Sequence, residues 1–172
     1  MIPSEEEAKK LWDKYQLPKE KRIHVALVAK VAMEFAKKIA VNRELLLAAA
    51  LLHDIDKAAK KLPGERHPDT AVRILLEEGM DEVAALVRTH PLHAILDPTI
   101  SPKTMEEKIL YLSDKMVKYD IVGIDQRFAL WHAENLPKEA TVLLDSTYPK
   151  VKALEKEMFS IAKISFALYT KG

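Results

Sequence analysis

The sequence of 172 residues has no cysteine and only four glycines, and these two shortages exclude several kinds of site. Without thiols the chain can form no disulfide, no thiolate-ligated zinc site and no cysteine nucleophile. Four scattered glycines cannot build a glycine-rich phosphate-binding loop, and no Gly-x-Ser-x-Gly turn is present. The His-Glu-x-x-His motif of zinc proteases and the Glu-x-x-His pairs of carboxylate di-iron bundles are absent too.

The chain also lacks an excess of charge and a long hydrophobic run. Lysine and arginine total 27 against 26 aspartate and glutamate, so the net charge of +1 gives no support for binding a nucleic-acid polymer. The apolar runs fall far short of the ~18 residues that a membrane span needs. The acidic start, residues 1–7, does not resemble a signal peptide. We therefore expect a cytoplasmic protein without a membrane partner.

What is abundant points to helices. Apolar residues make up 48% of the chain, and Ala, Leu, Lys and Glu dominate it. The length is typical of one domain, and we expect a single all-α domain over residues 1–172. Capping boxes at Ser4/Glu7 and Thr104/Glu107, with 3.6-residue periodicity, predict the helix boundaries. The expected helices cover roughly residues 4–16, 19–41, 43–53, 67–79, 81–90, 104–119, 125–135 and 138–170. A loop is expected over residues 91–102, and Pro149 either breaks the last helix or lies in its first turn.

A cluster of polar residues interrupts this apolar pattern. The run Ala48–Leu52 leads directly into His53 and Asp54, which places a costly carboxylate at the edge of the core. His24 lies on the apolar face of its expected helix, and Asp114 interrupts another such face. A lone buried histidine is more often hydrogen-bonded than a ligand. However, five of the six histidines fall between positions 24 and 93, which favours a shared site.

Mixed imidazole and carboxylate ligands suit Fe, Mn, Co, Ni or Zn better than Mg or Ca. One aspartate can bridge two ions, and metals ~3.5–4 Å apart can share a hydroxide and hold a phosphate. We therefore expect a divalent transition metal, as one or two ions. The candidate ligands are His24, His53, Asp54, His67, His90 and Asp114.

The order of these residues resembles the HD superfamily of metal-dependent phosphohydrolases. The segment His53–Lys57 looks like that family's His-Asp-x-x-Lys signature, and the resemblance spans about residues 20–120. It implies the all-helical HD bundle as the metal-binding core, here with an extra helical extension over residues 125–170. It also implies that His24, His53, Asp54 and Asp114 hold the first metal. His67 and His90, with Asp54 bridging, would hold the second.

The resemblance implies a metal-bound hydroxide that attacks phosphorus, with Asp54 and Lys57 as the catalytic residues. Lys57, Arg66 and Lys115 are the candidate contacts for substrate phosphate. Asp56 is either a general acid, a partner of a ligating histidine or a solvated loop carboxylate, and the last interpretation is favoured. We expect His93 to be exposed, and His132 to serve packing or lie at the surface.

The expected function is hydrolysis of a nucleotide or other phosphate ester. A phosphomonoesterase, a phosphodiesterase and a dinucleoside polyphosphate hydrolase all fit, because the segment 104–115 is similar to that of HD proteins that split diadenosine tetraphosphate symmetrically. The alternative is a regulatory or nucleotide-binding HD module that keeps its metal without turnover. The expected partner is a small molecule and no nucleic-acid polymer, and the long helical C-terminal stretch leaves a homodimer open.

Overall fold

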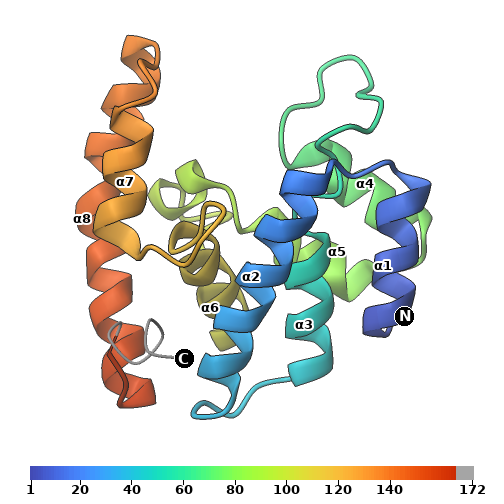
Figure 1. Ribbon diagram of the computed structural model, residues 1–172, viewed down its shortest axis with the longest axis horizontal. Helices are drawn as coiled ribbons and strands as arrows, with labels where there is room; N and C mark the ends of the chain where they lie inside the picture. Colours follow the sequence, from blue (N-terminus) through green and yellow to red (C-terminus); the bar gives the residue numbers. More distant parts are fainter. Residues whose placement is uncertain (166–172) are drawn as a thin grey trace.

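The computed structural model describes residues 1–165, and this part of the chain is built of helices without a named strand (Figure 1). This confirms the all-α expectation. In chain order the elements are α1 (Glu5–Lys14), α2 (Lys19–Ala36), α3 (Arg43–Leu52), α4 (Asp69–Glu77), α5 (Asp81–Arg88), the 3₁₀ helix η1 (Leu92–Leu96), α6 (Met105–Lys115), α7 (Ile124–His132) and α8 (Lys138–Ala162).

Side-chain caps fix where three of the helices begin. The Ser4 hydroxyl accepts the backbone N–H of Glu7, whose carboxylate accepts the N–H of Ser4, so the first capping box is confirmed. Asn42 caps α3 through its side-chain oxygen. At α6 the Thr104 hydroxyl accepts the N–H of Glu107. The carboxylate of Glu107, however, binds the backbone N–H of Lys103, so the second capping box closes one residue early.

Two helices end earlier than the apolar pattern predicts. Helix α2 ends at Ala36 instead of residue 41. Just after the helix end, the carbonyl of Phe35 accepts the N–H groups of both Lys38 and Ile39 in a turn. Ile39 is still buried, so the apolar pattern continues beyond the helix itself. Helix α6 stops at Lys115 instead of residue 119. There the carbonyl of Met116 accepts the N–H groups of residues 122 and 123, which turns the chain back.

The proline-rich and C-terminal segments also differ from expectation. The expected loop over residues 91–102 contains η1, which follows Pro91. Helix α7 begins at Ile124 and ends at His132, three residues short of the predicted end. Helix α8 continues through Pro149 without a break and ends at Ala162. The prediction that this helix continues beyond residue 162 is wrong for residues 163–165, because Lys163 adopts a left-handed conformation that ends the helix. The rest of the predicted range, residues 166–170, lies outside the described residues.

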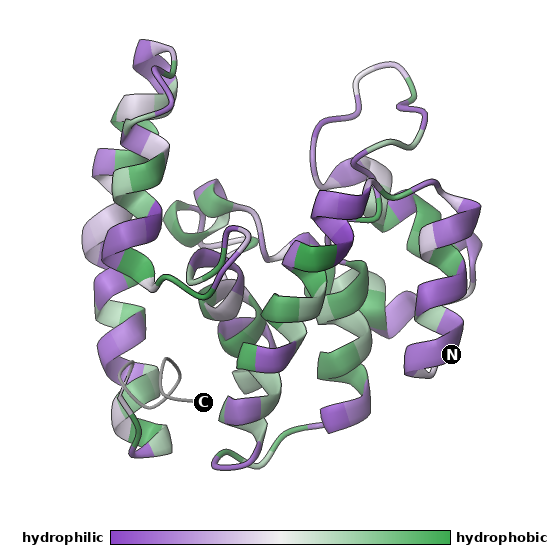
Figure 2. Ribbon diagram, viewed as in Figure 1, coloured by the Kyte–Doolittle hydropathy of each residue, from purple (hydrophilic) through white to green (hydrophobic). Residues whose placement is uncertain are grey.

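The core lies between α2, α3, α5 and α6, with α1 and α4 at one end of the molecule and α7 and α8 at the other (Figure 1). Helix α3 is apolar almost throughout its length and is buried on nearly all sides (Figure 2). The indole N–H of Trp12 donates to the carbonyl of Leu51 at 2.8 Å, which ties α1 to α3. Helix α8 packs against α6, α7 and η1. No described helix is long and apolar enough to cross a bilayer.

Candidate metal centre

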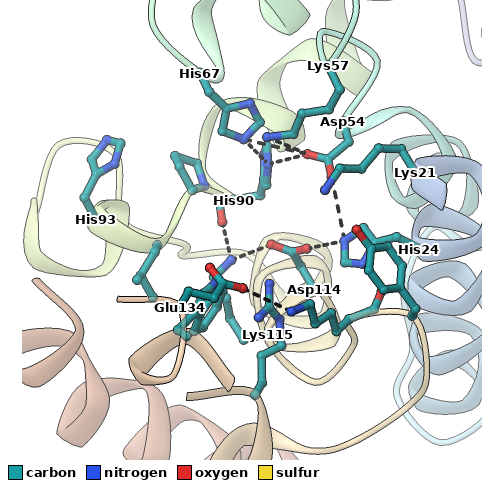
Figure 3. A pocket seen from close by; sticks show the side chains of 16 residues that line it. Lys21, His24, Asp54, Lys57, His67, His90, His93, Asp114, Lys115 and Glu134 are labelled. Atoms are coloured by element: carbon teal, nitrogen blue, oxygen red, sulfur yellow. Dashed lines mark hydrogen bonds and ion pairs between the residues drawn. The ribbon is translucent and has the colours of Figure 1, made fainter. Parts of the chain in front are cut away.

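Histidines and aspartates from five parts of the chain converge at one cavity of about 410 Å³, which all the candidate ligands except the fully buried His53 line (Figure 3). His24 projects from α2, His53 ends α3 and Asp114 lies in the last turn of α6. The other three flank the helices: Asp54 follows α3, His67 precedes α4, and His90 follows α5. Because apolar helix faces carry or end at these residues, packing the core brings the polar groups together.

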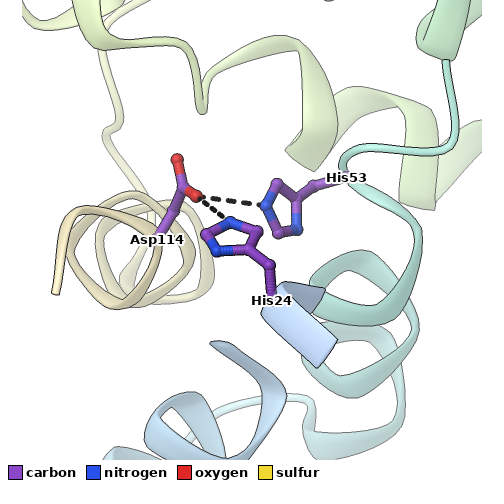
Figure 4. Close-up of side chains that lie close together, drawn as sticks. All are labelled: His24, His53 and Asp114. Carbon is purple, nitrogen blue, oxygen red and sulfur yellow. Dashed lines mark hydrogen bonds and ion pairs between the residues drawn. The ribbon is translucent and has the colours of Figure 1, made fainter. Parts of the chain in front are cut away.

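The first group is the core-side cluster, which consists of His24, His53 and Asp114 (Figure 4). The Nε2 atoms of His24 and His53 lie 2.9 Å and 3.1 Å from the same carboxylate oxygen, Oδ1 of Asp114. Oδ2 of Asp54 lies 3.7 Å from both nitrogens. Four donor atoms therefore surround one small volume, as a single metal ion would require.

The second group is the loop-side pair, His67 and His90. Their Nε2 atoms lie 2.9 Å apart. The other carboxylate oxygen of Asp54, Oδ1, lies 3.8 Å from His67 and 3.9 Å from His90. Asp54 thus turns one oxygen toward the core-side cluster and the other toward the loop-side pair, which is the arrangement of a bridging carboxylate.

All four imidazoles have the Nδ1 atom committed to an oxygen that can only accept a hydrogen bond. The partners of His24, His53, His67 and His90 are Lys118 O at 2.8 Å, Ala50 O at 2.7 Å, Asp56 Oδ2 at 2.7 Å and Val87 O at 2.5 Å. Each Nδ1 therefore carries the proton, and in the neutral ring Nε2 keeps its lone pair. These lone pairs face carboxylate oxygens or each other, which is repulsive unless a proton or a cation lies between them.

Burial alone would keep the carboxyls of Asp54 and Asp114 neutral, but nearby positive charge outweighs burial. The charge of His53 holds the pKa of Asp54 well below its usual range, and the Lys115 ammonium does the same for the pKa of Asp114. Burial also lowers the pKa of His53, yet the two carboxylates raise it above the ordinary value. The pKa of His90 is well below 6.5, first through burial and then through neighbouring histidines. The carboxylates of Asp54 and Asp114 are thus ionised, and the imidazole of His90 beside them stays neutral.

Asp56 is not the solvated loop carboxylate that the sequence favours. It is 2% exposed, and its Oδ2 accepts a hydrogen bond from His67 Nδ1. The chain turns directly after α3, and residues 53–56 of this turn segment are buried. Asp56 therefore orients a candidate ligand, which is the partner role that the sequence left open.

Lys115 is buried as well, at 1% exposure. Its ammonium donates to the carbonyl of His90 at 2.6 Å and to Oδ2 of Asp114 at 2.7 Å, and it lies over the ring of Tyr111. These contacts join the two groups of ligands. The ammonium therefore lies at the cavity lining, but it is already hydrogen-bonded to protein atoms.

The remaining predicted residues are spread over two cavities. Lys57 lines the cavity of about 410 Å³ that the candidate ligands share, which we call the metal cavity. Its Nζ lies 3.8 Å from Oδ1 of Asp54. Arg66 is exposed and lines a neighbouring cavity of about 890 Å³, outside the first one. His93 is exposed as expected and lines both cavities. His132 is at the surface as expected and lies 3.5 Å from Asp145.

The sequence reasoning missed part of the cavity lining. Lys21 and the residues Lys118, Tyr119, Arg127, Trp131 and Glu134 all line the metal cavity. The spacing of Arg127 and Trp131, four residues apart, predicts one shared helix face. That signal identifies the face but does not reveal that it points toward the histidines.

The comparisons with known proteins agree with this geometry. A family model described as HD domain matches residues 22–118, more than half of the chain. A tRNA (cytidine(56)-2'-O)-methyltransferase from Picrophilus torridus is 30% identical over 150 residues, a match that covers 80% of this chain and 41% of that protein. The chain therefore spans about two fifths of the length of this relative. No solved structure matches the chain.

Proposed function

The chain belongs to the HD domain family, and from this premise we propose that it is a metal-dependent phosphohydrolase acting on a small phosphate ester or nucleotide. The observation that carries the proposal is the set of four imidazole Nε2 atoms that converge on the carboxylates of Asp54 and Asp114. Such a donor set fits divalent transition metals. His24, His53, Asp54 and Asp114 would hold one ion, and His67, His90 and Asp54 a second.

A bound divalent ion supplies Lewis acidity, which activates water and neutralises the charge of a phosphoryl group. The protein's own groups fix the site around it. Asp56 sets the tautomer of His67, and Lys115 holds Asp114 in place. Because its ammonium is buried and occupied, we assign Lys115 this positioning role instead of substrate contact.

Lys57 is the best candidate for a phosphate contact. Its side chain is 33% exposed and its ammonium lies at the cavity beside Asp54. A cation there would neutralise negative charge on the phosphoryl oxygens as it develops. Arg66 would reach only a substrate that extends into the neighbouring cavity, where it lies near His67.

A second candidate function comes from the relative's printed name. That protein is a tRNA methyltransferase, so a phosphate at an RNA end is an alternative substrate. The net charge of +1 argues against it, because RNA binding depends largely on neutralising backbone phosphates. We therefore favour a small phosphate ester.

The test combines metal content with turnover. The protein is loaded with manganese and assayed on nucleotides, a general phosphomonoester, a general phosphodiester and a short RNA. We expect His53→Ala and Asp54→Ala to lose both metal and turnover, and His132→Ala, an exposed control, to keep both. Turnover unchanged in the two ligand variants would overturn the proposal. Metal bound by wild type without turnover of any substrate would instead support a regulatory module, and a preference for RNA would support the second candidate.

A further inference from the structure

Helix α7 contributes to the metal cavity although it lies beyond the family match at residues 22–118. Arg127, Trp131 and, just past the helix end, Glu134 line the same cavity as the candidate ligands. Figure 3 labels Glu134 at this cavity. We name these three residues the α7 patch. The candidate ligands thus come from the family core, and part of the cavity lining comes from beyond the residues that the family model matches.

The aromatic part of the α7 patch is held rigidly from behind. Phe128, which is buried, meets Trp131 edge to face with ring centroids 5.2 Å apart, and it meets Tyr148 of α8 at 5.1 Å. The ring of Phe128 therefore supports the indole, and Phe128 is itself supported by Tyr148 of α8. A braced aromatic ring loses little conformational freedom when a second flat group stacks near it.

Arg127 lies flat against this indole. Its guanidinium carbon is 3.8 Å from the ring centroid of Trp131, and its Nε donates to the carbonyl of Val117 at 3.2 Å. Its Nη1 is buried and is one of the few buried side-chain polar atoms, among the described residues, without a hydrogen-bond partner. The guanidinium and the indole therefore form one stacked pair at the cavity.

The polar end of the α7 patch is a carboxylate. Glu134 accepts a hydrogen bond from Lys118 at 3.1 Å and remains partly exposed at the cavity. A carboxylate can accept hydrogen bonds from two neighbouring hydroxyls, such as those of a ribose. Aromatic and guanidinium planes are the surfaces on which nucleobases stack. The α7 patch therefore offers groups for a base and for a sugar on the side of the cavity that faces the ligands.

We propose that the α7 patch is a nucleoside subsite, so that the phosphate ester bound at the metal centre is a nucleotide. The base lies against the Arg127–Trp131 stack, the ribose faces Glu134, and the phosphate faces Lys57 and the histidines. This inference rests on the proposed phosphohydrolase function for the position of the phosphate. The cavity of about 410 Å³ is within the range of roughly 300–1,000 Å³ found for ligand sites.

The first test needs no variant. Trp131 and Trp12 are the two tryptophans of the chain, and Trp12 is buried in α1 against Leu51. Titration of the manganese-loaded protein with nucleoside 5′-monophosphates should quench the fluorescence of Trp131. Ribose 5-phosphate, which carries the same phosphate and sugar without a base, should not. Equal quenching by both, or by neither, would overturn the nucleoside subsite.

The second test compares binding of the same two ligands by calorimetry. We expect Trp131→Ala to weaken binding of a nucleoside monophosphate by about 5- to 100-fold, the range for loss of one stacked base, and to leave ribose 5-phosphate unchanged. Arg127→Met should have the same direction. His132→Ala is the matched control, because His132 lies on the same helix but outside the metal cavity.

The outcomes separate this inference from the proposed function. Selective loss of nucleotide binding in a protein that hydrolyses no ester would keep the subsite and remove the hydrolase. Equal hydrolysis of nucleotide and ribose 5-phosphate, with no selective effect of Trp131→Ala, would keep the hydrolase and overturn the subsite. Equal loss of both ligands in a variant with an unchanged melting curve would also overturn it.

Discussion

The two parts of the metal centre are supported in different ways. The core-side cluster is carried by three packed helices, and His24, His53 and Asp114 are positioned by the whole bundle. In the loop-side pair, His90 is buried after α5, but His67 precedes α4 in a loop and its side chain is 27% exposed. Its ring is held by a hydrogen bond to Asp56 and by its contact with His90. The comparison indicates that one ion should bind to a preformed site and the other to a more adjustable one.

The largest effect should come from Asp54, because its two oxygens face both parts of the centre. We expect Asp54→Ala to lose both ions and to reduce turnover by about 10³-fold or more, since metals supply several kcal/mol of transition-state stabilisation. Metal content by mass spectrometry and hydrolysis of a general ester would be measured. A variant that retained both ions would contradict the bridging role.

The difference between the core-side cluster and the loop-side pair is tested by comparing His24→Ala with His67→Ala. Removing His67 should leave about one ion per chain in the core-side cluster, since the remaining donors there are untouched. Removing His24 should weaken the tighter site, which the bundle preforms. Calorimetric titration with manganese separates the two cases. If His67→Ala loses both ions, the two parts are not separable, and the comparison above is wrong.

Lys115 should matter more for the apo protein than for the metal-loaded one. Replacing it by Met leaves the largely buried Asp114 without its ammonium partner, and breaking a fully buried pair costs about 3–5 kcal/mol, so the loss of stability here should be at or below that range. A bound cation would compensate the same carboxylate, so added manganese should recover part of the loss. Chemical denaturation with and without metal measures both values. An equal loss in the two conditions would exclude this compensation.

The smallest effect should be that of Asp56→Asn. The amide is a weaker acceptor for His67 Nδ1, and loss of such a supporting hydrogen bond lowers metal affinity by about 10- to 100-fold. The change should appear in the weaker of two binding steps and leave the tighter step unaltered. Asp69→Asn, an exposed change just after the same loop, is a suitable control. A change confined to the tighter step would assign Asp56 to the wrong part of the centre.

Sequence reasoning could group the residues of the core-side cluster because they follow helical periodicity. His24 and Asp114 interrupt apolar helix faces, and a packed bundle must bring such faces together. Asp56 could not be placed in the same way. Turns follow no such period, and its burial depends on how residues 53–57 fold back against α3 and α4. Likewise, α2 and α6 end early because carbonyls near their ends accept hydrogen bonds from the backbone of later residues. No local sequence pattern predicts these hydrogen bonds.

The α7 patch was beyond sequence reasoning for a different reason. Arg127 and Trp131 share a helix face by spacing, but an exposed face and a cavity-lining face give the same pattern. Their direction is set by the turn after α6, where Gly123 adopts a positive φ of 83° before α7 begins. Only the path of that turn brings the two side chains to the cavity that the histidines line.

His53 and His90 share one local feature that reaches beyond the metal site. Each ring donates from Nδ1 to the carbonyl three positions earlier in its own helical segment, Ala50 for one and Val87 for the other. The nitrogen left free for coordination is therefore chosen within a single turn of helix, independently of any distant part of the chain. In both rings the nitrogen that remains for coordination is therefore Nε2, whichever order the helices pack in during folding. Assembly of the bundle then has only to bring the two Nε2 atoms together.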